Sequence, residues 1–175
     1  SKPWVGEYGN ADSMEKAQNV RHALAMAIDR EGINDAILGG LGSVNHITNI
    51  PIGSKHWDAK WEWPYDIAKA KELMASAGYA DGFEMTIWTG AGTHEEIVNA
   101  IGATWLSELG VKVSIDLQAY GTHRPRLVNL DFPHIQYRTC GDSFAALTVD
   151  LPKSNESTSD KLGGTICAGS MVPEW

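Results

Sequence analysis

The sequence predicts an α/β fold in which a small sheet carries helices on its faces, and three observations favour it. First, residues 82–88 and 111–118 alternate apolar and polar side chains, which is the period of a half-buried strand. Second, a helical period separates them over residues 93–110, as in parallel strands joined by a crossover helix. Third, 175 residues with 43% hydrophobic content can enclose one core. We therefore expect a single unit over residues 1–175.

Residues 19–40, NVRHALAMAIDREGINDAILGG, are predicted to form two helices. Apolar residues of the first recur at three- and four-residue spacing: Val20, Ala23, Leu24, Ala27 and Ile28. The pattern breaks near Asp29, which can cap a second helix. The second helix resumes the pattern with Ile33, Ala36 and Ile37, and Gly39 and Gly40 supply its end.

Residues 41–65 show no sustained period and are predicted to form a long, ordered, aromatic-rich loop. The loop contains two prolines and four large aromatic residues: Pro51, Pro64, Trp57, Trp61, Trp63 and Tyr65. The aromatic side chains either pack the loop onto the core or form a platform for a sugar or peptide. Packing is the interpretation that we favour.

Residues 65–78 are predicted to form a helix that Asp66 caps and Gly78 ends. The following strand alternates Phe83, Met85 and Ile87 with Glu84, Thr86 and Trp88, so the two sets are expected on opposite faces.

The helix over residues 93–110 opens with a capping-box pattern, Thr93 followed by Glu96. Its expected core face is Ile97, Ile101, Trp105 and Leu109. The strand after it should turn one set of side chains inward: Val111, Val113, Ile115 and Leu117. A short helix over residues 122–130 and a strand over residues 133–138 are expected next, and residues 151–175 are predicted to be a loop-rich tail.

Composition narrows the classes of partner and compartment. The net charge of −8 and the lack of a basic stripe argue against a nucleic-acid partner. No apolar stretch approaches the roughly 18–20 residues of a membrane-spanning helix. Cys140 and Cys167 form no C-x-x-C pair. They either form a disulfide, which would indicate an oxidising compartment, or remain two reduced thiols.

Three patterns could indicate a cofactor site, a metal site or a catalytic residue. The residues present argue against the first two. The segment WTGAGTHEE, residues 88–96, lacks the third glycine of a dinucleotide-binding turn, and its two glutamates would repel a pyrophosphate. The six histidines show no metal-ligand spacing, so neither a metal nor a cofactor is expected. Cys140 could be a nucleophile if a base such as His134 reached it. A small cysteine-dependent hydrolase is therefore an alternative function.

Three longer stretches, residues 19–40, 63–89 and 100–127, resemble in the same order the family 5 extracellular solute-binding proteins of ABC importers. The resemblance implies a two-lobed, periplasmic-binding-protein-like fold of which this chain is the second lobe, without the first lobe and the C-terminal return to it. It also implies a non-enzymatic receptor that carries a peptide or other small solute to membrane permease subunits. Such a receptor would be periplasmic or extracellular, or tethered to the membrane. A sensory domain that reuses the lobe is a further alternative.

The resemblance also implies a ligand-binding segment after the last predicted strand. In oligopeptide-binding members the matching aspartate receives the amino terminus of the ligand, which makes Asp142 the expected anchor for a cationic group. Thr139 stands where those members have a tryptophan, which puts peptide specificity in question. The carboxyl ends of strands in an open α/β sheet are where ligands normally bind. The expected cleft neighbours are therefore Tyr137, Arg138, Thr139 and Gly141, together with Trp88, Thr89 and Gly90 at the end of another strand.

Overall fold

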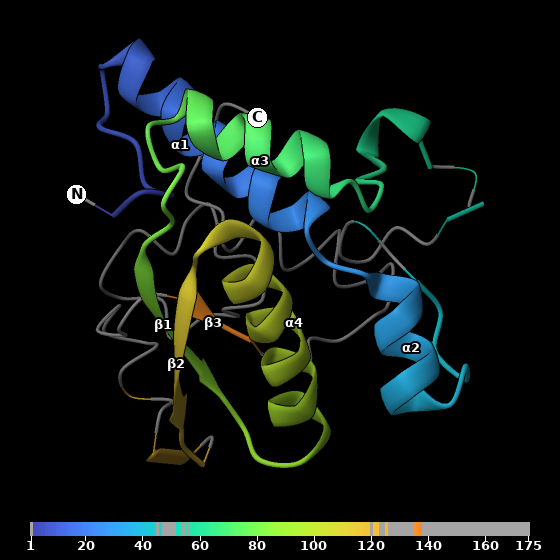
Figure 1. Ribbon diagram of the computed structural model, residues 1–175. Coiled ribbons are helices and arrows are strands. Elements are labelled where there is room, and N and C mark those ends of the chain that lie inside the picture. The colour runs from blue at the N-terminus through green and yellow to red at the C-terminus, as the bar shows by residue number, and fades with distance from the viewer. Residues whose placement is uncertain are drawn as a thin grey trace.

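A computed structural model of the protein shows a parallel sheet with helices packed against it (Figure 1). The structure describes residues 2–44, 46, 52–53, 55, 57–119, 121–122, 125 and 135–137. Within them the strands are β1 (Glu84–Thr89), β2 (Lys112–Leu117) and β3 (Ile135–Gln136), in the order β2-β1-β3. Both β2 and β3 pair with β1 in parallel. The predicted α/β fold class and parallel strands are thus confirmed.

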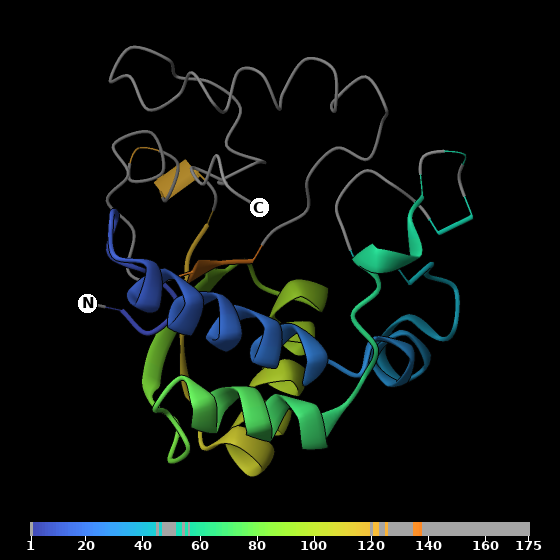
Figure 2. The ribbon, with the colours of Figure 1, turned by 90° about the horizontal axis from the view of Figure 1, so that it is seen from above.

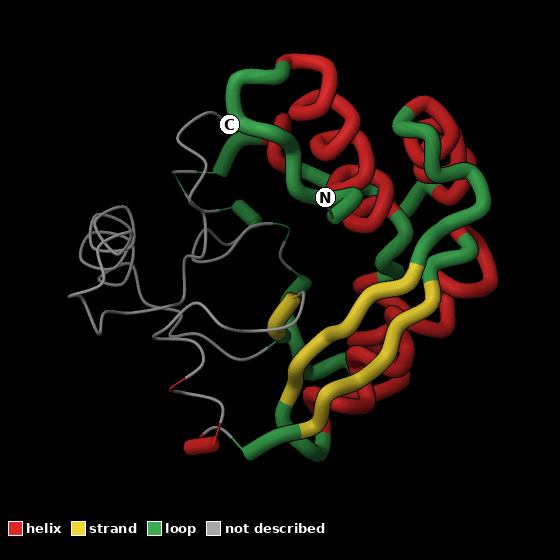
Figure 3. Tube along the Cα trace, turned by 90° about the vertical axis from the view of Figure 1, so that its left-hand side faces the viewer, coloured by secondary structure: helices red, strands yellow, loops and turns green. Residues whose placement is uncertain are grey.

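The bounds of four α-helices and one short 3-10 helix are defined among the described residues. They are α1 (Ala11–Met26), α2 (Arg30–Leu38), η1 (Ala59–Trp61), α3 (Ile67–Ser76) and α4 (Thr93–Leu109). Helices α1 and α3 lie side by side in both ribbon views (Figures 1 and 2). Helix α4 contacts β1 and β2 and covers one face of the sheet (Figure 3).

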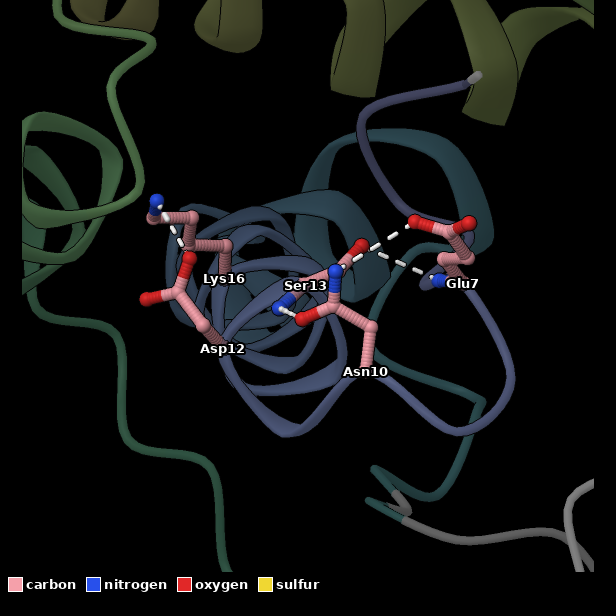
Figure 4. A network of polar contacts seen from close by, with 5 residues as sticks. All are labelled: Glu7, Asn10, Asp12, Ser13 and Lys16. Carbon is pink, nitrogen blue, oxygen red and sulfur yellow. Dashed lines mark hydrogen bonds and ion pairs between the residues drawn. The ribbon is translucent and has the colours of Figure 1, made fainter.

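Helix α1 begins earlier than the periodicity indicated, at Ala11. Asn10 is its N-cap, and the Asn10 Oδ1 atom accepts a hydrogen bond from the Ser13 N–H at 3.1 Å. Figure 4 shows this cap, the Glu7 N–H bond to the Ser13 hydroxyl and the neighbouring Asp12–Lys16 ion pair. The start of α1 carries no buried apolar residue before residue 17, so hydrophobic spacing alone could not locate it.

The predicted break between the first two helices is confirmed at Asp29. The Asp29 carboxylate accepts the Gly32 N–H at 2.9 Å, which caps α2. Gly39 ends α2 in the left-handed conformation with φ of 62°. Arg30 fastens the junction, because its Nη1 atom donates to the carbonyl oxygens of Ala25, Ile28 and Trp63 at 3.1–3.4 Å.

One hydrophobic cluster joins α1, α3, α4 and the inner face of β1. Its larger members from these elements are Val20, Leu24, Met26, Met74, Met85, Ile87, Val98, Ile101, Trp105 and Leu109. The indole N–H of Trp105 donates to the Leu24 carbonyl at 3.0 Å and ties α4 to the last turn of α1. Ile97, an expected core residue, is only partly buried, and Val98 is buried in its place.

The predicted capping box at the start of α4 is wrong. Gly92 is the N-cap, with φ of 82° and no side-chain cap bond, and Thr93 is already the first helical residue. The turn into α4 uses a positive φ, which glycine adopts without steric cost. The helix therefore starts one residue before the position that the pattern S/T-x-x-E assigns to it.

One inward assignment along the strands is also wrong. Leu117 was expected to be inward and is 47% exposed, whereas Trp88, on the opposite face of β1 from Met85 and Ile87, is 2% exposed. Alternation shows which side chains share a face, and it does not show whether that face is covered. Leu117 ends β2, which is one of the two outer strands of the described sheet.

The described part of the aromatic-rich segment packs against α1 and against itself. The Trp63 ring packs at a tilt of 37° against the His22 ring, with centroids 4.3 Å apart, and the backbone N–H of Trp63 donates to Nδ1 of His46 at 3.0 Å. Trp57 meets Trp61 edge-on at 6.1 Å. The short helix expected over residues 122–130 falls mostly outside the described residues, and the tail over residues 151–175 falls entirely outside them.

Candidate functional site

The carboxyl edge of the sheet brings together residues that lie far apart in the sequence. The Tyr137 N–H, just after β3, donates to the Trp88 carbonyl of β1 at 2.8 Å. The Gln118 N–H, just after β2, donates to the Thr89 carbonyl at 3.2 Å. Three strand ends therefore meet at one edge, where Gly90 continues the chain from β1.

Tyr137 is the predicted site residue that follows β3 at this edge. Burial raises the pKa of its phenol, so the group is neutral over the physiological range. Its ring meets the His94 imidazole edge-on, with centroids 5.8 Å apart. His94 lies in the first turn of α4, and its Nδ1 atom lies 3.7 Å from the position that a Cβ on Gly90 would occupy.

Sequence reasoning did not include His94 in the site. The spacing of the six histidines indicates no metal site, and it carries no other signal for His94. The signal that could have identified it is position: His94 opens the helix that follows β1, and such turns lie at the carboxyl edge.

Trp88 and Thr89 lie at the predicted edge, although their side chains are buried. Trp88 is 2% exposed and Thr89 is fully buried. The Thr89 hydroxyl donates to the carbonyl of Gly90 at 3.5 Å. In this conformation the two residues support the edge through their backbone, and Gly90 and Tyr137 are the more accessible of the predicted residues.

The remaining predicted site residues lie outside the described residues. They are the ligand-contacting candidates Arg138, Thr139, Gly141 and Asp142, and the cysteines Cys140 and Cys167. Their roles stay predictions, as does the choice between a disulfide and two thiols.

A partly open hollow of about 280 Å³ adjoins this edge, between α2 and α4. Its lining is mostly apolar: Ile28, Ile33, Leu38, Val44, Ile97, Ile101 and Tyr137, with Arg30, Asn34, Gly42 and Ser43. The residues come from three separate stretches of the chain, residues 28–44, residues 97–101 and Tyr137, so no local pattern could have indicated it.

Two further searches concern only the described residues. No group of three or more His, Cys, Asp or Glu side chains among them is placed to hold a metal ion. No helix in that part of the chain is both long and apolar enough to cross a bilayer.

Comparison with known proteins identifies the family of the chain. Residues 10–151 match the sequence model of the bacterial extracellular solute-binding proteins, family 5, middle region. Heme-binding protein A of Haemophilus influenzae is 31% identical over 113 residues, which are 61% of this chain and 20% of that protein. Glutathione-binding protein GsiB of Salmonella typhimurium is 34% identical over 98 residues, which are 55% of this chain and 19% of that protein.

A solved structure with a similar fold is also a solute-binding protein. The dipeptide-binding protein of a Pseudoalteromonas species, in complex with Met-Leu, superposes with a TM-score of 0.57 at 27% identity. The match covers 67% of this chain and 24% of that one. This chain spans about a fifth of the length of the two sequence relatives. It has the α/β fold of one lobe of a periplasmic binding protein, and it belongs to the family 5 bacterial extracellular solute-binding proteins.

Proposed function

We propose that this chain is the second lobe of the solute-binding component of an ABC importer. The solute lies at the carboxyl edge of the sheet, between this lobe and a first lobe of the same receptor. Hinge closure traps the solute, and the closed receptor delivers it to permease subunits in the membrane. The observation that carries the proposal is the convergence of three parallel strand ends at Gly90 and Tyr137 in a member of this family.

The electrostatics of the edge favour a cationic group on the solute. The N-terminus of α4 points its partial positive charge toward this edge, but Glu95 and Glu96 in the first turn more than offset it. The net charge of −8 adds to the negative potential. We infer that Asp142 anchors the ammonium group of the solute, with Arg138, Thr139 and Gly141 beside it.

A peptide with a free amino terminus is the solute class that we propose. The relatives are named for heme and glutathione, and the solved dipeptide-binding protein holds Met-Leu. Dipeptides combine the ammonium group that Asp142 would bind with side chains that an apolar cleft would cover. The relatives are named as binding proteins, so we propose that the chain has no catalytic activity and works in the periplasm or outside the cell.

Calorimetry on the full-length receptor with Met-Leu tests the anchor. Asp142→Asn should weaken binding roughly tenfold to hundredfold, because a hydrogen bond to a charged group contributes about 1.5–3 kcal/mol. N-acetyl-Met-Leu, which lacks the ammonium group, should bind the two proteins equally. Asp81→Asn, an exposed aspartate before the amino end of β1, is the matched control and should bind like wild type. Equal Met-Leu affinity for Asp142→Asn and wild type would refute the anchor.

The same titration tests Tyr137. Tyr137→Ala should weaken Met-Leu binding about tenfold, because truncating a well-packed aromatic at an interface typically costs more than about 1 kcal/mol. Tyr8→Ala removes a tyrosine that is 95% exposed near the N-terminus and should leave affinity unchanged. If both variants bind like wild type, the carboxyl edge is not the binding face.

A further inference from the structure

Trp63, which lies shortly before α3, is held by groups from three other parts of the chain. Its backbone N–H donates to Nδ1 of His46 at 3.0 Å. Its ring packs against the ring of His22 in α1, with centroids 4.3 Å apart. Arg30, the first residue of α2, donates from Nη1 to the Trp63 carbonyl oxygen at 3.4 Å. The position of the chain at Trp63 therefore depends on two imidazoles and one guanidinium.

The bond between His46 and Trp63 closes a loop at its base. Its two partners lie 17 positions apart in the sequence, one after α2 and the other before α3. Trp57, between them in the sequence, packs against the His46 ring with centroids 6.1 Å apart and meets Trp61 edge-on at 6.1 Å. Loss of the bond would leave the Trp63 N–H without its acceptor and open the loop at this point.

This bond requires one protonation state of His46. A neutral imidazole has one ring nitrogen that donates and one that accepts, whereas a protonated imidazole donates from both. Because Nδ1 of His46 accepts the Trp63 N–H, this nitrogen carries no proton while the loop is closed. Protonation of Nδ1 would set two donors against each other. Since histidine changes its charge between about pH 5 and 8, the closure of the loop depends on pH in that range.

The charged groups around the loop base do not favour a protonated imidazole. Within the described residues, no carboxylate is hydrogen-bonded or ion-paired to His22 or His46. Two positive charges lie close instead, Arg21 next to His22 and Arg30 on the Trp63 carbonyl. The carboxylates nearest to Trp63 along the chain are occupied or exposed: Asp58, Glu62 and Asp66. A proton added to either imidazole therefore gains no anionic partner among these residues.

His22 acts in the same direction as His46. Burial, and then the charge of Arg21, lowers the pKa of His22. The state in which the Trp63 ring covers His22 therefore binds fewer protons than an open state, in which His22 regains its ordinary value. A fall in pH favours the state that binds more protons, which is the open one.

We propose that His46 and Trp63 form a pH-sensitive latch, which closes the loop between them at neutral pH and releases it as the pH falls. The latch is built from this lobe alone and needs neither a solute nor a first lobe, so it stands independently of the function proposed above. Release exposes the face of His22 that the Trp63 ring covers and removes the link between the loop base and α1.

Hydrogen–deuterium exchange of the full chain at pH 7.5 and 5.5, read by mass spectrometry, tests the latch. Exchange times are scaled at each pH to the intrinsic rate of an unstructured peptide. The protection of the peptide that contains Trp63 should fall about tenfold from pH 7.5 to 5.5, because one titrating group weakens closure by up to about tenfold per pH unit. The peptide from α3 should keep its protection, since the latch opens locally.

Substitutions of His46 separate its titration from its bond. His46→Asn supplies an amide oxygen that accepts the N–H and does not titrate, so it should keep protection at pH 7.5 and lose most of the fall. His46→Gln is a second non-titrating variant with the same expected result. His46→Ala removes the acceptor and should give low protection at both pH values. His94→Asn, at a histidine whose ring contacts Tyr137, is the matched control and should fall like wild type.

Three results would overturn the latch. The first is a wild-type peptide around Trp63 that is equally protected at both pH values. The second is a fall of the same size in wild type and in the two non-titrating variants, which would assign the fall to groups other than His46. The third is full protection of His46→Ala at pH 7.5, which would show that the His46 bond does not hold the loop closed.

Discussion

Replacing Trp105 by phenylalanine should lower the free energy of unfolding, because it removes the hydrogen bond that joins α4 to α1. Trp105 is 6% exposed, and its indole N–H donates to the Leu24 carbonyl in the last turn of α1. The N–H of Ile28, four residues on, bonds Ala25 instead of Leu24. The indole therefore satisfies a carbonyl that the end of the helix leaves open.

The expected cost follows from two terms. A buried acceptor left without its donor costs about 1–3 kcal/mol, and the smaller phenylalanine ring leaves a void worth about 1 kcal/mol. Trp105→Phe should therefore lower the free energy of unfolding by about 3 kcal/mol, a large part of the roughly 5–15 kcal/mol of a typical domain.

Urea unfolding followed by circular dichroism measures this change. Trp61→Phe, at a partly exposed indole in η1, is the matched control and should change the free energy by about 0.5 kcal/mol or less. If Trp105→Phe and Trp61→Phe unfold at the same urea concentration, the Trp105–Leu24 bond does not stabilise the fold as argued.

Three further perturbations test other parts of the structure. Gly82→Ala should cost more than about 2 kcal/mol in urea unfolding, because a Cβ there would overlap the Gly110 backbone at a φ of 77°. Gly78→Ala, with φ of 86° and open space, should cost only about 1–2 kcal/mol; equal costs would exclude the steric contact. Burial, and then the charge of Arg21, lowers the pKa of His22 below 6.5. The unfolded state then binds more protons, so this stabilisation is complete above pH 6.5 and is lost as the pH falls through the folded pKa. The urea midpoint of His22→Gln should therefore decrease less than that of wild type between pH 7.5 and 5.5. An equal decrease in both proteins would mean that groups other than His22 cause it. Asp29→Ala should cost about 1 kcal/mol in urea unfolding whereas Asp29→Asn should cost little, since only the first removes the cap of α2; equal losses would contradict that role.

The features that sequence reasoning located correctly are local ones. The Asp29 and Asp66 caps each accept a backbone N–H three residues on, at 2.9 Å, so a few consecutive residues carry the signal. The glycine ends of α2 and α4 are equally local, because Gly39 and Gly110 adopt positive φ values at those positions. The capping box at Thr93 failed although it is local, because the preceding glycine turn supplied a competing start.

The candidate site was predictable in position and less so in detail. Parallel strands end at one edge of a sheet, so the sequence alone predicts that Gly90 and Tyr137 lie near each other, and the Tyr137 bond to Trp88 agrees. The burial of Trp88 and the contact of His94 with Tyr137 depend on which elements cover the edge. Those contacts join residues more than 40 positions apart, and no periodicity reports them.

The sequence by itself determined the α/β class, the order of the helices and strands and the resemblance to a solute-receptor family. Helix caps and apolar periods depend only on residues that are close together in the sequence. The tertiary structure alone decided that Leu117 is exposed, that Trp105 fastens α4 to α1 and that a hollow remains between α2 and α4. These features arise from packing, in which the space left by one segment depends on the shape of segments far away in the chain.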